Sequence, residues 1–339
     1  MALASATADA QVYPERVTVK VKARKTSEDT AYSSQRRTRD DNRDEQIERT
    51  TKTFRLGDGG SLALGNIAGD ITITRASGGE TTVEIVKSAR GRDAADARDM
   101  LQLVTVEATE RNGRAELKTH YPGDEARRNG RRNINVSVAY NVTAPAGTRV
   151  SAESISGDIK VTDIKGEVSA NSISGDLRIT GGGRVSAAKT ISGSVEIIDA
   201  QVDGTIEAKS VSGDVTLRHV SARQVDAGSV SGDVRLEDIQ SERVSVSTTS
   251  ADIFFSGTLA KKGHYELKGF SGDVHLQLSG NTGFEVDATS FSGQIRSDDF
   301  PITSTRRGVD RHSLSGTYGD GSAVLDLQTF SGSIVISKR

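Results

Sequence analysis

From residue 158 onward, aspartates recur at a nearly constant spacing, each directly after a glycine or, once, an alanine. The six residues are Asp158, Asp176, Asp214, Asp233, Asp252 and Asp273. If successive copies stack, their carboxylates lie ~5 Å apart and repel one another unless a cation such as Ca²⁺ bridges them. The alternative, which we favour, is that each carboxylate accepts hydrogen bonds from the amides of its own corner, as in an Asx turn. Calcium-binding nonapeptide solenoids need a shorter repeat, which this sequence lacks.

Aromatic and basic residues offer two further candidate interaction sites. In the C-terminal copies of the repeat, Phe270, Phe291 and Phe330 take the slot that Ile155 and Val211 fill earlier. Stacked and exposed, three such rings could form a ladder for sugars, whereas the match to Ile and Val favours inward packing or a covered corner. A cluster of arginines could contact anionic polysaccharide, lipid headgroups or nucleic acid, although a solvated loop is the simpler interpretation. The cluster comprises Arg127, Arg128, Arg131 and Arg132.

Catalysis and cofactor binding find little support in the sequence. Serines recur two positions before the aspartates, as at Ser156 and Ser174, but a nucleophilic serine needs a nearby base and no histidine falls in these copies. The five histidines show no metal-ligand spacing, and without cysteine there is no thiolate site or disulfide. We therefore expect no enzyme activity, no catalytic residue and no cofactor.

The residues above belong to a repeated phrase, Ser-Ile-Ser-Gly-Asp-Ile and its variants. Its glycines lie at 157, 175, 193, 213, 232, 272, 293 and 332, with Ala251 in the same slot, so most copies are 18 to 21 residues apart. The last spacing of 39 is close to two repeats and suggests one coil without the phrase. A repeat this short without a helical pattern indicates a β-solenoid. The predicted fold is all-β, a single-stranded parallel β-helix of about ten coils. We expect a right-handed winding, because the coil length drifts.

Four sections follow from the pattern along the chain. Residues 1–11 form a signal-peptide remnant or a disordered terminus, since Ala8-Asp9-Ala10 has the small-x-small form of a cleavage site. Residues 12–53 are charged and expected to be largely disordered. Residues 54–148 should form a strand-rich cap with one helix near 93–103, where apolar residues are spaced three and four apart. Residues 149–339 form the solenoid, with an inserted loop at about 297–321.

Composition limits the function classes. The net charge of -2 argues against general nucleic-acid affinity, and no stretch approaches the roughly 18 apolar residues of a membrane span. Only 34% of residues are apolar, which suits a narrow tube lined with Val, Ile, Leu and Ala.

The phrase repeats after an entry strand that ends Val142-Thr-Ala-Pro145. In this combination, residues 54–339 resemble the DUF4097 family of bacterial β-strand-repeat proteins. The resemblance implies a secreted or envelope-associated β-helix, often labelled an adhesin, and supplies no catalytic residues. The leading hypothesis is a non-catalytic exported scaffold or adhesin-like protein that is periplasmic, cell-surface or extracellular. Its partner would be a protein or glycan of the cell envelope. One alternative is a filament subunit stacking as a homo-oligomer through uncapped solenoid ends, and a weaker one is a carbohydrate-active, lyase-like β-helix.

Overall fold

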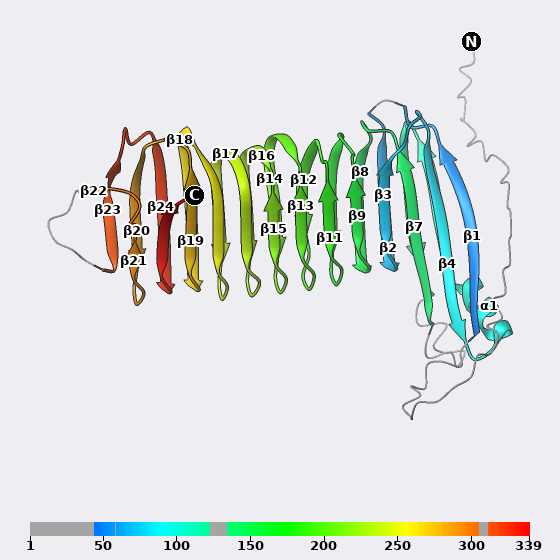
Figure 1. Ribbon diagram of the computed structural model, residues 1–339. Helices are drawn as coiled ribbons and strands as arrows, with labels where there is room; N and C mark the ends of the chain where they lie inside the picture. The colour runs from blue at the N-terminus through cyan, green and yellow to red at the C-terminus, as the bar shows by residue number, and fades with distance from the viewer. Residues whose placement is uncertain (1–43, 58, 123–133, 305–310) are drawn as a thin grey trace, which may run out of the picture.

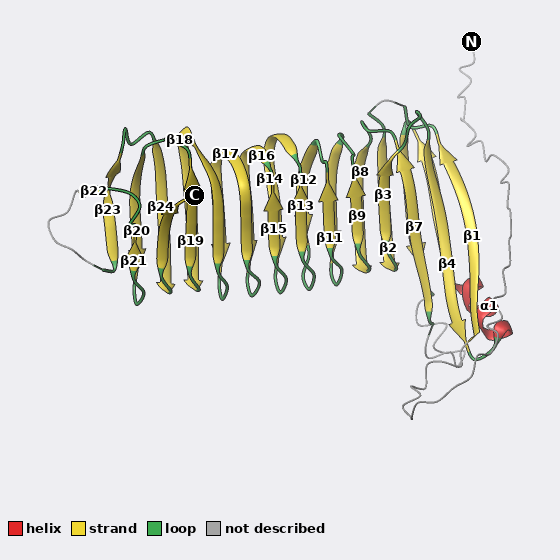
Figure 2. Cartoon of the chain, in the orientation of Figure 1, coloured by secondary structure: helices red, strands yellow, loops and turns green. Residues whose placement is uncertain are grey.

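The computed structural model describes residues 44–57, 59–122, 134–304 and 311–339. Within these ranges the chain forms twenty-five strands, all in one continuous hydrogen-bonded sheet, and one helix. Figures 1 and 2 show a long rod of stacked strands that is widened at its N-terminal end by longer strands and the helix. The all-β fold expected from the sequence is therefore correct.

The central rod repeats one arrangement, in which a strand leads into the phrase, the phrase makes a turn, and a second strand leads away. Each strand pairs in parallel with the matching strand of the next coil, so that Ile159, Leu177 and Val195 stack in register. These side chains are fully buried because every second residue of a strand points into the tube. The strands are β8 (Arg149–Ser156), β9 (Ile159–Thr162), β10 (Glu167–Ser172), β11 (Leu177–Thr180), β12 (Arg184–Lys189), β13 (Val195–Ile198), β14 (Gln201–Ser210), β15 (Val215–Arg218), β16 (Ser221–Ser229), β17 (Val234–Thr248), β18 (Ile253–Ser271) and β19 (Val274–Ser279).

The N-terminal end of the rod combines an early coil with a cap section, most of which is inserted between that coil and the next one. Strands β2 (Ser61–Ala68) and β3 (Ile71–Arg75) already form a coil, which pairs in parallel with β8 and β9. The chain then leaves to make the cap section and returns at Arg149. The cap comprises β1 (Asp44–Phe54), β4 (Thr81–Gly91), α1 (Ala94–Leu103), β5 (Thr105–Arg111), β6 (Arg114–His120) and β7 (Val136–Ala144).

The helix α1 matches the prediction from spacing. The Asp93 carboxylate accepts a hydrogen bond from the Asp96 amide at 2.8 Å and so caps the helix N-terminus. Ala97, Met100 and Leu101 are the buried side chains of the helix. With ten residues it is short, and no helix in the described ranges is long and apolar enough to cross a membrane.

The prediction that residues 12–53 are largely disordered is wrong for residues 44–53, which belong to strand β1. This strand pairs antiparallel with β4 along its whole length. Its charged side chains are matched across the pair, with Arg49 3.0 Å from Glu84 and Lys87 3.3 Å from Glu48. A charged sequence can join a sheet because only one face is covered and the other keeps its charges in water. Residues 12–43 and the signal-like terminus at 1–11 lie outside the described residues.

At the distal end of the rod, the C-terminal coil lies inside the stack. Strand β24 pairs in parallel with both β18 and β20, and β25 pairs with both β19 and β21. The last spacing of 39 residues therefore does not contain a coil without the phrase, because the chain passes outward to Gly293 and then returns to insert Gly332 between Gly272 and Gly293. The strands of this end are β20 (Phe284–Ser290), β21 (Ile295–Arg296), β22 (Thr303–Ser304), β23 (Ser313–Tyr318), β24 (Ala323–Ser331) and β25 (Ile334–Lys338).

The expected loop at 297–321 is only partly a loop. Strand β23 pairs antiparallel with β20, and β22 pairs antiparallel with β23, so the insertion covers the distal end of the sheet. Phe300 and Tyr318 pack against Phe284, with ring centroids 5.3 Å from it in both cases. This apolar contact explains why a polar, glycine-rich sequence is ordered there. It also removes the expectation that the last coil ends the rod uncapped, while residues 305–310 lie outside the described part of the chain.

Candidate interaction surface

The turns that carry the phrase line up along one edge of the rod, which we call the phrase edge. In most turns the glycine lies directly over the glycine of the preceding coil, the exception being the coil in which Ala251 fills this slot. A Cβ built on Gly213 would lie 1.9 Å from the carbonyl oxygen of Gly193, and one on Gly232 would lie 2.1 Å from that of Gly213. Such contacts are far below van der Waals separation. The close approach of neighbouring coils therefore favours glycine in this column more than the bend itself does, and Ala251 is accommodated in one coil.

A buried column of hydroxyls supports each turn from inside. The Ser210 hydroxyl donates to the carbonyl oxygen of Gly193 at 2.8 Å and accepts from the amide of Gly213 at 2.9 Å. Ser229 repeats both bonds one coil further on. Ser210 and Ser229 thus each join their own turn to the preceding one, whereas the buried hydroxyls of Ser154 and Ser172 have no hydrogen-bond partner among the described residues. This bonding assigns a structural role to these hydroxyls, which lie two residues before the serines considered in the sequence.

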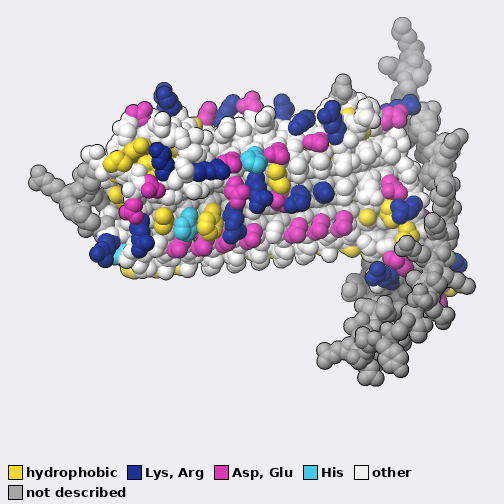
Figure 3. Space-filling model, in the orientation of Figure 1, with side chains coloured by type: hydrophobic (Ala, Val, Ile, Leu, Met, Phe, Trp, Pro, Cys, Tyr) yellow, Lys and Arg dark blue, Asp and Glu magenta, His cyan; other side chains and the backbone are white. Residues whose placement is uncertain are grey.

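The aspartates form a column beside the turns that is interrupted at Ser194, and Figure 3 shows acidic side chains in a row along this part of the rod. Each carboxylate accepts a hydrogen bond from the amide at the same position of the next coil. Asp158 accepts from the Asp176 amide at 2.9 Å, Asp176 from the Ser194 amide at 2.8 Å, and Asp252 from the Asp273 amide at 2.8 Å. The expectation that each Asp bonds the amides of its own corner is therefore wrong. The stacking of coils brings a nearer donor to each carboxylate.

Calcium binding by this aspartate column stays a prediction. Its carboxylates are close together, but one oxygen of each bonded residue already accepts an amide hydrogen bond. Near the distal end, Arg235 lies 2.7 Å from Asp233 and 3.9 Å from Asp214. In the described ranges, no group of three or more His, Asp or Glu side chains is arranged to hold a metal ion.

Next to the aspartates runs a second column of exposed apolar side chains. These side chains occupy the second position of the phrase, such as Ile155, and each coil contributes one of them as a rung of the column. Backbone hydrogen bonds link neighbouring rungs, as where the Ser174 amide donates to the Ile155 carbonyl at 2.9 Å. The exposed fractions of these side chains lie between 42% and 71%. The members of this apolar column are Ile155, Ile173, Ile191, Val211, Val230, Phe270, Phe330 and Phe291, in the order of the coils.

The match of Phe to Ile and Val in this slot favours burial of the aromatic part of the column, and that interpretation is wrong. Phe270, Phe330 and Phe291 are exposed by 57%, 47% and 71%. The signal for exposure was present in the phrase. The preceding hydroxyl residue, such as Ser154, points inward, so strand alternation directs the next side chain outward.

The three phenylalanines form one ladder of parallel rings. Phe330 lies between the other two, with ring centroids 5.1 Å from Phe270 and 4.7 Å from Phe291, and the rings are within 3° of parallel in both pairs. Both faces of the central ring are therefore occupied by its neighbours. A sugar that binds an aromatic side chain stacks on a ring face, so this arrangement mainly offers ring edges. It presents an apolar ridge more than a set of sugar platforms.

On the other side of the apolar column lies a mixed charged strip. Lys189 and Lys209 contact Glu207 at 2.6 Å and 3.0 Å, and Lys209 also contacts Asp226 at 3.0 Å. A hydrogen bond from Lys189, and a smaller effect of the one from Lys209, hold the pKa of Glu207 below its usual range. The strip is thus internally neutralised. The aspartate side of the apolar column carries the larger uncompensated charge.

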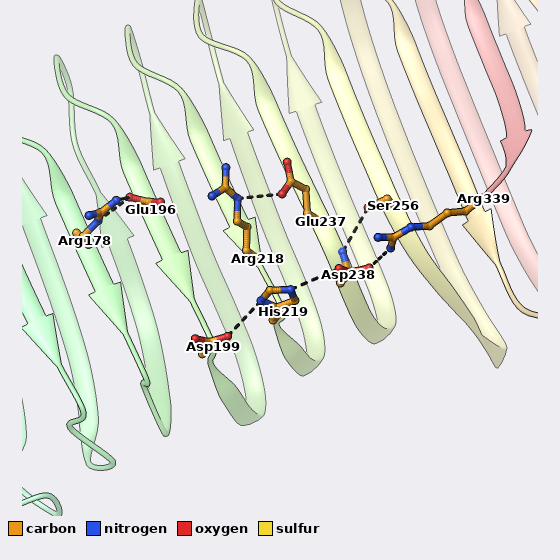
Figure 4. Close-up of polar contacts among 9 residues, drawn as sticks. All are labelled: Arg178, Glu196, Asp199, Arg218, His219, Glu237, Asp238, Ser256 and Arg339. Carbon is orange, nitrogen blue, oxygen red and sulfur yellow. Dashed lines mark hydrogen bonds and ion pairs between the residues drawn. The ribbon is translucent and has the colours of Figure 1, made fainter.

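A second set of charged residues lies at the opposite end of the strands (Figure 4). His219 lies between two carboxylates of neighbouring coils, 3.2 Å from Asp199 and 3.5 Å from Asp238, and Arg339 contacts Asp238. The residues Asp199, His219 and Asp238 have positive φ angles of 53°, 49° and 54°, so this corner also uses the left-handed region. His219 is 62% exposed, and its two ring nitrogens face carboxylates. The arrangement is a surface ion-pair chain.

A hollow of the surface lies beside this set of charged residues. It has a volume of about 450 Å³ and includes Arg235, Phe254, His275 and Arg339 among its lining residues. His275 stacks on Phe254 with centroids 5.1 Å apart, and the Arg235 guanidinium lies 5.0 Å from the same ring. Both sides of Phe254 are therefore covered. The basic groups in the hollow are paired with Asp233 and Asp238, which leaves little charge for a ligand.

The arginine cluster at 127–132 lies outside the described residues, so the structure does not place it.

Taken together, these features define an all-β, solenoid-like scaffold with a long apolar and acidic edge. A family model describes this kind of chain and matches residues 61–337. The chain belongs to that family, Toastrack DUF4097, and the resemblance seen in the sequence is confirmed.

Several solved structures are similar to this chain at a low level. A "putative adhesin" from Bacteroides fragilis is 13% identical with a TM-score of 0.42, covering 86% of this chain and 97% of its own. A "putative adhesin" from Parabacteroides distasonis is 11% identical with a TM-score of 0.37, covering 85% and 97%. A "putative lipid binding protein" from the same species is 10% identical with a TM-score of 0.40, covering 84% and 96%. No curated protein matches the sequence. Likeness at this level carries no argument about function.

Proposed function

We propose that this chain is a non-catalytic, exported scaffold of the adhesin-like kind that binds a macromolecular partner through the phrase edge. The observation that supports the proposal is the apolar column, in which eight Ile, Val and Phe side chains remain 42% to 71% exposed in consecutive or nearly consecutive coils. A contiguous apolar surface of this kind is uncommon on soluble proteins unless another molecule covers it. A partner of the cell envelope fits the family resemblance.

The same proposal includes the finer features of the fold. We infer a right-handed winding, as the drift in repeat length predicts, and about ten coils, counted from the nine copies of the phrase and the coil of β2 and β3. Residues 54–148 would stiffen the N-terminal end, and residues 149–339 would supply the length of the binding edge. The lyase-like alternative gains no support from the described residues, because the aromatic column offers few free ring faces. Stacking through an uncapped C-terminal coil lacks its basis, because β24 and β25 are internal.

A capture experiment tests the proposal. The full chain and a variant with Phe270→Ser, Phe291→Ser and Phe330→Ser are immobilised and exposed to a cell-envelope fraction. The dominant captured component is then purified and titrated against both proteins. We expect the variant to bind at least roughly tenfold more weakly, as for the loss of aromatic anchors. Phe254→Ser, which removes an aromatic ring from the hollow lined by Arg235 and His275, is the matched control and should bind normally. Equal capture by the triple variant would refute the proposal.

A further inference from the structure

The period and charge of the phrase edge indicate which kind of partner fits it, and this inference rests on the function proposed above. We propose that the phrase edge binds a basic, amphipathic α-helix of a partner protein lying along the rod axis. The helix would place its apolar stripe on the apolar column and its Lys or Arg side chains against the aspartate column.

The spacing of the rungs matches a helix better than a strand. Neighbouring coils are ~4.8 Å apart, which sets the distance between successive rungs of the apolar column. An α-helix presents one apolar position per turn at a pitch of ~5.4 Å, a mismatch of about 0.6 Å per rung. An extended strand repeats on one face every ~6.7 Å, so its mismatch is about 1.9 Å per rung. After little more than one rung, the side chains of a strand are therefore displaced from the apolar column by half of the spacing between rungs.

The same arithmetic sets the length of the contact. The helix drifts by half a rung after about four rungs, so about four turns fit before register is lost. The largest exposed side chains occupy the distal rungs, where Phe270, Phe330 and Phe291 are adjacent. Thr249 interrupts the apolar column on the proximal side of Phe270 and is exposed. The phenylalanine ladder is accordingly the expected centre of the contact.

Charge selects a basic partner. The aspartate column runs beside the apolar column, and in the distal half it includes Asp252 and Asp273. The strip on the other side of the apolar column is internally paired, since Glu207 and Asp226 contact its lysines in the central coils and Lys268 contacts Glu266 beside Phe270. An acidic peptide or an anionic membrane would bring negative charge against the aspartates. A helix with Lys or Arg along one border of its apolar stripe would place positive charge there instead.

A second copy of this chain fits the edge poorly in either orientation. Strand β7 pairs with β3 only from Tyr140 onward, so residues 136–139 continue past the first phrase turn, and Figure 1 shows the cap section extending beyond that edge. Two parallel rods packed edge to edge would bring these overhanging caps into the same space. Two antiparallel rods would place one aspartate column opposite the other. A slim helix meets neither obstacle.

The test uses synthetic peptides as probes. A basic peptide of about 18 residues carries Leu at i, i+3, i+4 and i+7 spacing with Lys at the borders, and is titrated by fluorescence anisotropy into the full chain. One control peptide replaces Lys with Glu, and another scrambles the order so that the same composition forms no stripe. Vesicles of an anionic phospholipid form the fourth probe. We expect the basic helix alone to bind well, and more weakly as salt is raised.

Two sets of variants locate the contact. Phe270→Ser with Phe330→Ser should weaken binding of the basic helix roughly tenfold or more, whereas Phe254→Ser should leave it unchanged. Asp252→Asn with Asp273→Asn keeps the amide-accepting oxygen in place and should weaken binding about threefold while reducing its salt dependence. Circular dichroism and thermal melting confirm that the exposed substitutions leave the fold intact.

The inference is overturned if the basic helix does not bind, if the scrambled, acidic or vesicle probe binds equally well, or if binding is unaffected by the phenylalanine variant. These results would leave the proposed function standing as long as the envelope capture still depends on the phenylalanine ladder. Loss of that dependence, with helix binding retained, would instead refute the proposed function alone.

Discussion

Replacing Gly232 with alanine should destabilise the middle of the rod by about 3 kcal/mol. The added Cβ would lie 2.1 Å from the carbonyl oxygen and 2.3 Å from the carbonyl carbon of Gly213. Since backbone atoms surround the site, no flexible side chain can move away to relieve the clash. The two turns must separate by about 1 Å to restore an ordinary contact.

That separation disrupts the hydrogen bonds that hold the turn. The Ser229 hydroxyl donates to the Gly213 carbonyl oxygen at 2.9 Å, the Asp233 amide to the Asp214 carboxylate at 2.9 Å, and the Ser231 amide to the Val211 carbonyl at 3.0 Å. Each such bond contributes about 1 kcal/mol net, which gives the estimate of about 3 kcal/mol. Because a solenoid is stabilised through contacts between adjacent coils, the effect should stay local.

Hydrogen exchange is the appropriate assay. We expect faster exchange in β15, β16 and the start of β17, and unchanged exchange in β9 and β11, several coils away. The control is Gly204→Ala in β14, where the nearest atom to an added Cβ is 4.0 Å away. That change should be neutral, or should stabilise by about 0.4–1 kcal/mol through the unfolded state. Unchanged exchange in the Gly232→Ala protein would refute the argument that close approach dictates the glycine column.

Two further predictions concern the charged columns. Asp176→Ala should destabilise its coil by about 1–2 kcal/mol because it removes the acceptor for the Ser194 amide. Asp176→Asn keeps an acceptor and relieves repulsion between carboxylates, so it should destabilise the coil less. Urea denaturation of both variants at low and high salt separates the two contributions, and equal losses of stability would argue against the amide bond. The folded pKa of Glu207 is held low by hydrogen bonds from Lys189 and Lys209, so its contribution to stability is complete above the unfolded pKa of about 4.3 and is lost as pH falls through the folded pKa. A Glu207→Gln protein should therefore show a smaller drop in melting temperature between neutral pH and acid than the unchanged chain, and identical pH profiles would contradict this assignment.

The site could be predicted from sequence only in part. The phrase identified which residues share a column, because a solenoid repeats each position at each coil. The alternation that ends at Ser154 points the second slot outward, but Ile and Val at a turn are also compatible with burial, so the pattern alone did not decide the exposure of this slot. The inward direction of Ser154 and its equivalents decides that point. Nor could the sequence show that Phe330 lies between Phe270 and Phe291, because this order depends on where the last coil is inserted.

The charged segment before Phe54 illustrates a second limit. By composition it has too few apolar residues to form structure alone, yet residues 44–53 pair with β4 along their whole length. The stabilising partner is distant in sequence. Composition measures what a segment can bury by itself, and cannot register backbone hydrogen bonds and ion pairs supplied by another strand.

The sequence by itself determined the all-β class, the repeat, the helix near 93–103 and the family, because alternation and spacing are local properties. The tertiary structure decided the bonding of the aspartates, the exposure of the apolar column and the position of the C-terminal coil. These depend on which backbone lies above each turn. That neighbour is chosen by the packing of coils and caps, and no single copy of the phrase contains this information.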